Sequence, residues 1–379
     1  MAALASAAPV WAQAFQTLAP YAILMDADTR TVLFEKAADD LVSPASTAKL
    51  MTAEIIFHEI AEGRLKLADE FTISKNAWHE GGARAGGSSM FALVDSRVSI
   101  ENLIQGLVVQ SGNDAAIALA EGIAGSEGAF ATLMNRRASE LGMAKSTFAN
   151  PWGKADAAQK VTAREMMMLA DHVIRTYPEL YKYFGEKEFT WNKIKQQNRN
   201  PLLFMDIGAD GLKTGNVEDS GFGLIGSAVQ NGQRLILVVN GLKSAKDRAE
   251  EARKILQWGF RAFEPKTLFA AGEIIGSARL YGGAQAEVDL QAEGAVKVLI
   301  PRGSGERLSA RIVYTGPIAA PVAQGAKIAR LQVLRGTVQA LDVPLKAATG
   351  VEVGPLPRRA YDAAVELATD LIRRNFGKK

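Results

Sequence analysis

The residue pattern of this chain changes at Phe263-Glu264-Pro265, and the change divides the sequence into two parts. Before this point, helix-like and strand-like segments alternate, whereas residues 267 to about 354 show short apolar runs and frequent glycine. A length of 379 residues is also too great for one ordinary hydrophobic core. We therefore predict an α/β (α+β) domain over residues 15–264 and a small all-β domain over residues 265–354.

The first part contains strand-like segments at both of its ends, with helices between them. Strands are expected at residues 21–26 and 31–34, and a hairpin at 222–239 turns at the polar residues 230–233. A strong helical pattern opens at Pro44 and runs to about residue 62. Further helices are expected at residues 100–109, 115–123, 127–141, 163–176 and 245–263.

Both ends of the chain suggest additional segments. Residues 1–14 are small and apolar, and Ala12-Gln13-Ala14 matches the pattern before a signal-peptide cleavage site. The usual basic start of a signal is missing, because the first basic residue is Arg30, so an alanine-rich tail is the alternative. Residues 355–379 open with two prolines and continue as an amphipathic helix with basic residues at both ends. Such a helix can lie on a membrane surface or dock on its own domain, and the spacing alone favours neither.

Composition excludes several classes of protein. There is no cysteine, so disulfides, thiolate catalysis and cysteine metal sites are absent. His58, His79 and His172 are the only histidines and form no H-E-x-x-H pair, which disfavours a zinc hydrolase. The net charge is only +3 and no long basic run occurs, so nothing suggests a nucleic-acid partner.

Three short motifs occur in order: Ser46-Thr47-Ala48-Lys49, Ser111-Gly112-Asn113 and Lys213-Thr214-Gly215. Each is weak alone, and Ser74-Lys75-Asn76 also fits the second pattern by chance. Their order, spacing and structural context together match the set found in penicillin-binding proteins and class A β-lactamases.

The first motif has the chemistry of an activated nucleophile. Ser46 falls at the start of the predicted helix, and Lys49 follows one turn later on the same side. A serine hydroxyl attacks only when a nearby base takes its proton, and a lysine can do so only when it is neutral. Burial and a neighbouring cation, for which Lys213 is the candidate, would lower the pKa of Lys49.

The other two motifs supply groups that could handle a peptide. Ser111 lies in the break between two predicted helices, from which its hydroxyl could pass a proton to a leaving amine. Asn113 offers both a donor and an acceptor for a substrate amide. Gly215 would let the substrate backbone approach closely, and the backbone N–H groups of Ser46 and Asn216 could form an oxyanion hole.

The chain resembles the D-alanyl-D-alanine carboxypeptidases among the low-molecular-mass penicillin-binding proteins, over roughly residues 20–379. The likeness lies in residues 41–52, in Gly87-Ser88-Ser89-Met90-Phe91, in residues 110–115, in residues 210–215, in the β-rich second part and in the terminal amphipathic helix. It implies a β-lactamase/transpeptidase-like catalytic domain, followed by the small β domain and a helix that rests on the outer face of the inner membrane.

The resemblance also implies roles and partners. Ser46 would be the nucleophile, Lys49 the proton acceptor and Ser111 the proton shuttle, while Lys213 and Thr214 would hold the terminal carboxylate of the substrate. Arg199 resembles the family arginine near that carboxylate, with a solvated surface arginine as the alternative.

The expected substrates are peptidoglycan stem peptides, the expected inhibitors are β-lactams, no cofactor is needed, and the expected compartment is the periplasm. Asn216 departs from the family, in which this position is often histidine.

The sequence fits two other functions less well than that of a carboxypeptidase. A class A β-lactamase places a glutamate in a loop after the second motif, but residues 141–164 contain no glutamate, and Asp156 is their only acid. A wall-binding or cell-shape protein with a silent active site would be free to lose Lys49 or Ser111, yet both are present. The sequence therefore favours the carboxypeptidase.

Overall fold

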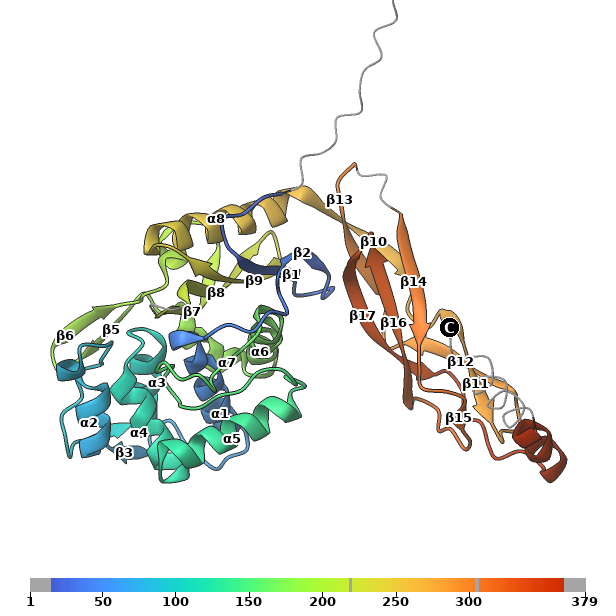
Figure 1. Ribbon diagram of the computed structural model, residues 1–379, viewed down its shortest axis with the longest axis horizontal. Helices are drawn as coiled ribbons and strands as arrows, with labels where there is room; N and C mark the ends of the chain where they lie inside the picture. Colours follow the sequence, from blue (N-terminus) through green and yellow to red (C-terminus); the bar gives the residue numbers. More distant parts are fainter. Residues whose placement is uncertain (1–14, 218–219, 304–306, 365–379) are drawn as a thin grey trace, which may run out of the picture.

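The computed structural model describes residues 15–217, 220–303 and 307–364, which form two domains side by side (Figure 1). The first is a sheet with helices on both faces, and the second is built from strands. The predicted fold class, a mixed α/β domain followed by an all-β domain, is therefore confirmed. The proposed signal segment 1–14 and most of the proposed terminal helix, residues 365–379, lie outside the described residues.

The sheet of the first domain is antiparallel and has the strand order β2-β1-β9-β8-β7. Alternate side chains of a strand point to opposite faces, so each face of this sheet has its own core. On β9, Leu235 and Leu237 pack with helix α8, whereas Ile236 and Val238 pack with the helices of the other face. The bounds are β1 (Tyr21–Asp26), β2 (Val32–Lys36), β7 (Ala209–Val217), β8 (Gly221–Gln230) and β9 (Gln233–Leu242).

The helices begin where side chains can cap them. Ser99, Ser126, Thr162 and Ser244 each accept a hydrogen bond from the backbone N–H three residues later. The helices are α1 (Lys49–Ala61), α2 (Lys75–Gly81), α3 (Ile100–Val108), α4 (Asn113–Ala124), α5 (Glu127–Glu140), α6 (Ala163–Thr176), α7 (Pro178–Tyr181) and α8 (Ala245–Ala262). The helix predicted from Pro44 instead opens with a 3₁₀ turn, η1 (Ala45–Ala48), before α1.

Shorter elements connect the helices. Two small two-stranded sheets were not predicted. β3 (Glu70–Thr72) pairs with β4 (Arg97–Ser99) across the intervening residues 73–96, and β5 (Glu188–Trp191) forms a hairpin with β6 (Ile194–Gln197). The remaining 3₁₀ turns are η2 (Ala83–Ala85), η3 (Lys182–Gly185) and η4 (Pro201–Phe204).

The second domain starts directly after α8, so the predicted boundary at residue 265 lies inside strand β10 (Phe263–Phe269). β10 pairs with β13 (Val296–Pro301), and the other strands form a sheet of order β14-β16-β17-β12-β11-β15. Leu290, Val333 and Leu345 are fully buried in its core. The bounds are β11 (Ile274–Tyr281), β12 (Glu287–Ala292), β14 (Leu308–Val313), β15 (Ile318–Ala319), β16 (Lys327–Arg335) and β17 (Val338–Ala347).

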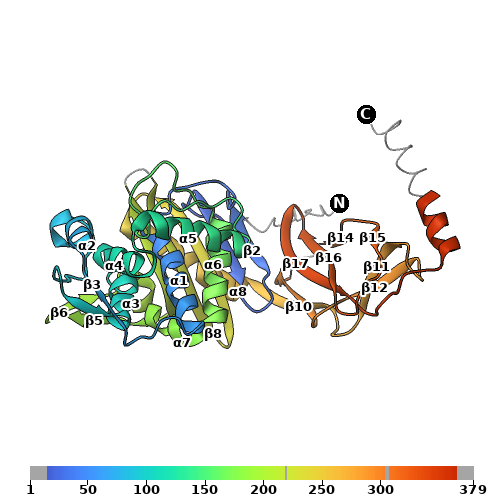
Figure 2. The ribbon, with the colours of Figure 1, turned by 90° about the horizontal axis from the view of Figure 1, so that it is seen from below.

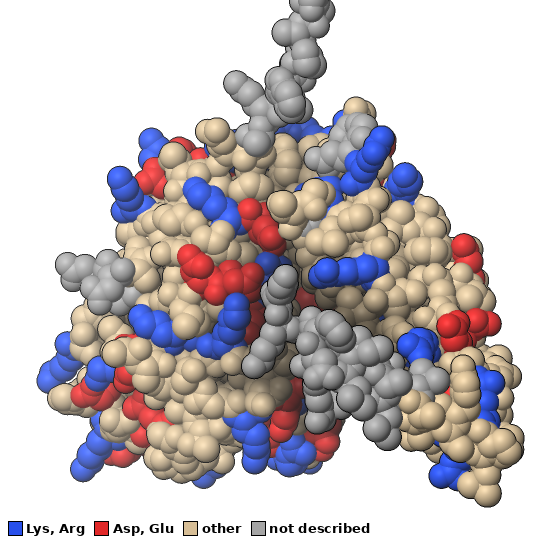
Figure 3. Space-filling model, turned by 45° about the vertical axis from the view of Figure 1, so that its right-hand side comes forward, with Lys and Arg blue, Asp and Glu red and all other residues tan. Residues whose placement is uncertain are grey.

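A helical segment at residues 356–364 lies beyond the second domain, at the end of the molecule opposite the first domain (Figure 2). Within the described ranges, no helix has the length and apolar character needed to cross a membrane. Acidic and basic side chains are interspersed over the face seen in Figure 3, so this face carries no large patch of a single charge.

The domains meet at the β1–β2 hairpin. The backbone N–H of Leu299 donates to Thr31 Oγ1 at 3.1 Å, and Arg335 donates to the carbonyl of Leu33 at 2.6 Å. The Arg335 guanidinium also lies 5.3 Å from the ring centroid of Phe263. The second domain is therefore attached near β2, and β7 forms the opposite edge of the sheet.

Candidate active site

Ser46 lies in the 3₁₀ turn η1, directly before α1. The preceding residue, Ala45, has φ = 47°, a backbone conformation that costs energy for a residue with a Cβ. Gly153 lies against this turn so closely that a Cβ there would overlap the carbonyl of Ala45. Thr52 Oγ1, one helical turn further along, donates to the carbonyl of Pro151 at 2.6 Å. The loop around residues 150–153 thus holds the turn that carries Ser46.

Lys49 is 1% exposed and connects the first two motifs. Its Nζ donates to Ser46 Oγ at 3.1 Å, to Asn113 Oδ1 at 2.7 Å and to the carbonyl of Trp152 at 2.6 Å. Burial lowers the pKa of Lys49 to about 7, and Arg199 acts in the same direction, whereas the negative charge of Asp114 opposes the shift. An amine with this pKa can both accept and release a proton near neutral pH.

Ser111 joins the second motif to the third. It lies between α3 and α4 with φ = 65°, and its Oγ accepts a hydrogen bond from Lys213 Nζ at 2.8 Å. Lys213 also donates to the carbonyl of Thr214 at 3.0 Å. Lys213 is 1% exposed, and its burial, with the nearby cations Lys49, Arg199 and Arg248, lowers its pKa well below the ordinary value.

Strand β7 runs beside the turn that carries Ser46. A Cβ at Gly215 would lie 3.0 Å from the carbonyl oxygen of Pro44 and 3.2 Å from the backbone nitrogen of Thr47. Glycine at this position therefore permits close approach of the two backbones. Asn216, the next residue, lines the same cleft as Ser46.

The cleft consists of two adjoining cavities of about 410 and 480 Å³, which share Ser46, Ser88, Arg199 and Asn216. No acidic side chain is among the described residues that line them. The smaller cavity is completed by Ser111, Thr214, Gly215, Phe222, Ala245 and Arg248, and the larger by Gly86, Gly87, Asn113, Trp152, Gly153, Lys154 and Ala155.

Two arginines enter this cleft. Arg199 Nε donates to the carbonyl of Gln110 at 3.0 Å, and its side chain lines both cavities. Arg248, from α8, was not predicted as a site residue. Its guanidinium lies 5.7 Å from the ring centroid of Phe222, and its buried Nε has no hydrogen-bond partner among the described residues. Burial and the charge of Arg199 lower the pKa of Arg248 to about 10.

All the residues that the sequence singled out therefore gather around one cleft: Ser46, Lys49, Ser111, Asn113, Arg199, Lys213, Thr214, Gly215 and Asn216. Asp114, Trp152 and Arg248 belong to the same neighbourhood but were given no role from the sequence. His58, His79 and His172 do not line either cavity. Within residues 15–217, 220–303 and 307–364, no group of three potential ligands could hold a metal ion.

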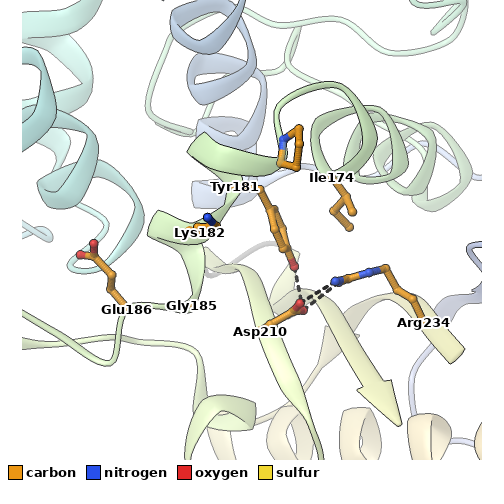
Figure 4. Close-up of a pocket in the computed structure, with 8 residues that line it drawn as sticks. Ile174, Tyr181, Lys182, Gly185, Glu186, Asp210 and Arg234 are labelled. Atoms are coloured by element: carbon orange, nitrogen blue, oxygen red, sulfur yellow. Dashed lines mark hydrogen bonds and ion pairs between the residues drawn. The ribbon is translucent and has the colours of Figure 1, made fainter. Parts of the chain in front are cut away.

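Another cavity of about 460 Å³ lies at the start of β7 (Figure 4). Three of its polar groups are paired with one another: Tyr181 donates to Asp210 Oδ1 at 2.8 Å, and Arg234 lies 2.7 Å from Asp210 Oδ2. The described residues that line this cavity include no hydroxyl hydrogen-bonded to an amine, in contrast to Ser46 and Lys49 in the cleft. The ion pair instead anchors the strand that carries Lys213.

Two family models match this chain. The family model described as D-alanyl-D-alanine carboxypeptidase (peptidase S11) matches residues 7–244, and the model of the C-terminal domain of penicillin-binding protein 5 matches residues 263–353. D-alanyl-D-alanine carboxypeptidase DacC of Escherichia coli K12 is 39% identical over 343 residues, which are 90% of this chain and 86% of the relative.

Two solved structures extend the comparison. Penicillin-binding protein 5 from Haemophilus influenzae is 35% identical and matches with a TM-score of 0.74, covering 89% of this chain and 99% of that one. Penicillin-binding protein D2 from Listeria monocytogenes, solved in the ampicillin-bound form, is 27% identical with a TM-score of 0.59, covering 65% of this chain and 99% of that one.

Proposed function

Since this chain belongs to the D-alanyl-D-alanine carboxypeptidase family of serine peptidases, we propose that it removes the terminal D-alanine of peptidoglycan stem peptides through an acyl-enzyme on Ser46. The observation that carries this proposal is the contact between Ser46 Oγ and the buried amine of Lys49, at 3.1 Å. It pairs a nucleophile with a base that can be neutral near pH 7.

Acylation would proceed as follows. Lys49 accepts the proton of Ser46 as Oγ attacks the carbonyl carbon of the D-Ala-D-Ala bond. The backbone N–H groups of Ser46 and Asn216 stabilise the negative oxygen of the tetrahedral intermediate. The C–N bond then breaks, the leaving nitrogen takes the proton of Ser111, and D-alanine departs. Ser111 regains a proton from the ammonium of Lys49, which is thereby neutral again. In the second half, Lys49 accepts a proton from water as the water attacks the ester carbonyl carbon. The bond to Ser46 Oγ then breaks, Oγ takes that proton from Lys49, and the shortened peptide leaves.

The smaller cavity is suited to the terminal carboxylate of the substrate. Arg199 and Arg248 line it and bring positive charge, and the hydroxyl of Thr214 can donate a hydrogen bond. The unpaired Nε of Arg248 offers an additional donor. Because no described acid lines this cavity, a substrate carboxylate would meet these groups without a competing negative charge.

The larger cavity would hold the peptide on the acyl side of the scissile bond. Asn113 is oriented for this task, since its Oδ1 accepts from Lys49. Its Nδ2 therefore remains free to donate to a peptide carbonyl. Nδ2 also faces the cleft wall, because it lies 2.7 Å from the position that a Cβ at Gly87 would take.

The same nucleophile would react with β-lactams. Support comes from the ampicillin-bound Listeria relative and from the described residues that line the larger cavity, among which no acid is present to activate a deacylating water. Glu165, the first glutamate after residue 141, is engaged elsewhere: Ser146 Oγ donates to it at 2.5 Å and the N–H of Lys145 at 2.9 Å. A long-lived adduct is therefore expected rather than the rapid turnover of a β-lactamase.

We place this activity in the periplasm, where its substrate lies, with the segment around residues 355–379 as a membrane-surface helix. The proposal rests on the amphipathic pattern of that segment and on the A-x-A site at residues 12–14. Cell fractionation tests it, because removal of residues 356–379 should release the protein from membranes. Membrane binding that survives this deletion would contradict it.

The central experiment measures D-alanine released from a muramyl pentapeptide by the wild-type protein and by Ser46→Ala. Release by the wild type and its loss in the variant are expected. Intact mass spectrometry after penicillin exposure should show one adduct, carried by Ser46 and absent from Ser46→Ala. An unmodified wild-type protein without D-alanine release would favour the silent wall-binding alternative, and turnover of penicillin far above one per enzyme would favour a β-lactamase.

A further inference from the structure

We propose that Asp114 is a positioning residue for this reaction, because its buried carboxylate fixes the cleft wall at residues 87–92 against the turn that carries Ser111 and Asn113. This inference rests on the proposed function and adds a residue to it. Asp114 touches neither cavity and would therefore act through the groups it holds.

The carboxylate of Asp114 is completely buried and collects donors from the wall. Its Oδ2 accepts from Ser89 Oγ at 2.6 Å and from the N–H of Ala92 at 3.2 Å. Its Oδ1 accepts from the N–H of Met90 at 2.9 Å and from that of Ala115, in its own helix, at 3.0 Å. The backbone of the wall segment is therefore folded around the carboxylate of Asp114.

The wall held in this way contributes directly to the cleft. Ser88 lines both cavities, and its carbonyl accepts from the N–H of Asn113 at 2.7 Å. The backbone around Asp114 is also tightly packed, because a Cβ at Gly112 would lie 2.8 Å from Asp114 Oδ1 and 3.1 Å from the backbone nitrogen of Met90. A shift of this carboxylate would consequently move Ser111, Asn113 and Ser88 together.

The hydrogen-bond directions indicate a negatively charged carboxylate. Ser89 Oγ accepts from the N–H of Phe91 at 2.9 Å and therefore donates its own hydrogen to Asp114. The remaining partners are backbone N–H groups, which can only donate. Asp114 also lies in the first turn of α4, where negative charge is favourable. Burial raises the pKa of Asp114, and these donors act against that effect.

The charge of Asp114 also reaches the general base. Lys49 is surrounded by Arg199 and Lys213, which disfavour its charged form, and by Asp114, which favours it. Asp114 thus holds the pKa of Lys49 up against burial. Removal of this charge would lower the pKa of Lys49 and extend its neutral form to more acidic pH.

The experiment compares the full-length wild type with Asp114→Asn, by D-alanine release from a pentapeptide over a range of pH. The amide keeps the shape but loses the charge and replaces one acceptor oxygen by a donor. We expect kcat/KM to fall about 10- to 100-fold, as for small misplacements of catalytic groups. In a plot of kcat/KM against pH, the rising limb should also move to lower pH. The shift of the limb is a result that a purely structural role would not give.

Ser89→Ala serves as the second variant, because it removes one donor and leaves the charge in place. It should lower kcat/KM about 5-fold without moving the rising limb. Glu165→Gln is the matched control: Glu165 is also a buried carboxylate in the first turn of a helix, bonded to a serine and a backbone N–H, but away from the cleft. It should lower thermal stability and leave kcat/KM and its pH profile as in the wild type.

The outcomes separate the two proposals. Two results would overturn the role of Asp114 and leave the proposed function intact, provided that the wild type releases D-alanine. One is a kcat/KM of Ser89→Ala equal to that of the wild type. The other is a folded Asp114→Asn variant whose pH profile is unchanged. If the wild type itself released no D-alanine and formed no penicillin adduct, the proposed function would fail first.

Discussion

At the scale of single residues, the cleft combines burial with an excess of positive charge. Lys49 and Lys213 are both buried, and Arg199 and Arg248 lie close enough to lower the pKa of at least one of these amines. Each cation makes the others easier to deprotonate. A lysine can therefore replace the histidine that serine hydrolases more often use as a base.

The pH dependence of the reaction should show this arrangement. Lys49 has to be neutral to accept the proton of Ser46, and its pKa is about 7, so kcat/KM should rise as the pH increases through about 7. Lys49→Arg should lose activity by about 1000-fold, because a guanidinium keeps its proton. Rates of D-alanine release between about pH 5 and 9 test this, and a profile that is flat across that range would contradict it.

Arg248 should matter only for substrates that end in a free carboxylate. Replacement by glutamine removes a charged donor from the smaller cavity, and kcat/KM should fall about 10-fold. A pentapeptide with an amidated C-terminus should react equally slowly with the wild type and the variant. Arg253→Gln, an exposed arginine on the same helix, is the control and should behave as the wild type. Equal loss on both substrates would argue against carboxylate recognition.

Sequence patterns identified the residues that belong to motifs, because S-x-x-K, S-x-N and K-T-G encode their own chemistry. Arg248 carries no such signal, since it lies inside an amphipathic helix like any other basic residue. Asp114 directly follows a motif, but its partners, Ser89 to Ala92, are brought to it only by the fold. Roles that depend on contacts distant in sequence could not be predicted from one chain.

At the scale of elements, helix α1 carries the candidate base, Lys49, at one end and a buried acid further along. Glu54 is fully buried and accepts hydrogen bonds from Arg137 at 2.8 Å, His172 at 3.2 Å and Tyr177 at 3.2 Å. Although burial acts to raise it, the hydrogen bonds from His172 and Arg137 keep the pKa of Glu54 below its ordinary value. These contacts tie α1 to α5 and α6.

Replacement of Glu54 by glutamine should therefore destabilise the first domain by about 3 kcal/mol, because Arg137 would lose its buried charged partner and keep only its ion pair with the exposed Glu140. Denaturant unfolding followed by circular dichroism measures this. The matched control is Glu59→Gln on the same helix, whose ion pair with Arg64 at 2.7 Å lies on the surface and should contribute within about 0.5 kcal/mol. Equal losses in the two variants would contradict the role of burial.

The longer elements were predicted well because their periodicity extends over several turns, as in α6, whose bounds match the predicted range 163–176. Errors occurred where local contacts decide the structure. Helix α4 begins at Asn113 rather than at residue 115, since the turn after Ser111 leads directly into it. The two-stranded sheets β3–β4 and β5–β6 have strands of three or four residues, too short for a recognisable alternation.

At the scale of the whole molecule, the second domain and the cleft lie at opposite edges of the sheet of the first domain. The second domain contacts β2, whereas the cleft borders β7. Four strand spacings separate these edges by about 19 Å. We therefore expect changes at the domain interface to leave the candidate site residues undisturbed. This separation follows from strand order, and no sequence pattern revealed it.

Replacement of Arg335 by alanine tests this separation. The variant loses the hydrogen bond to Leu33 and the contact with the Phe263 ring, so the domains should unfold at more widely separated temperatures in calorimetry. The kcat/KM for D-alanine release should stay within about 2-fold of the wild type, because surface changes far from a site have small effects. A large fall in kcat/KM with normal unfolding would show that the interface does influence the cleft.

The positively charged side chains gathered at the smaller cavity have a kinetic consequence. The D-alanine that leaves still carries the carboxylate by which the substrate was held, and the cavity has no described acid to repel it. Free D-alanine should therefore compete with fresh substrate, and progress curves should slow before the substrate is exhausted. The rate of the enzyme would then depend on how quickly its surroundings carry D-alanine away.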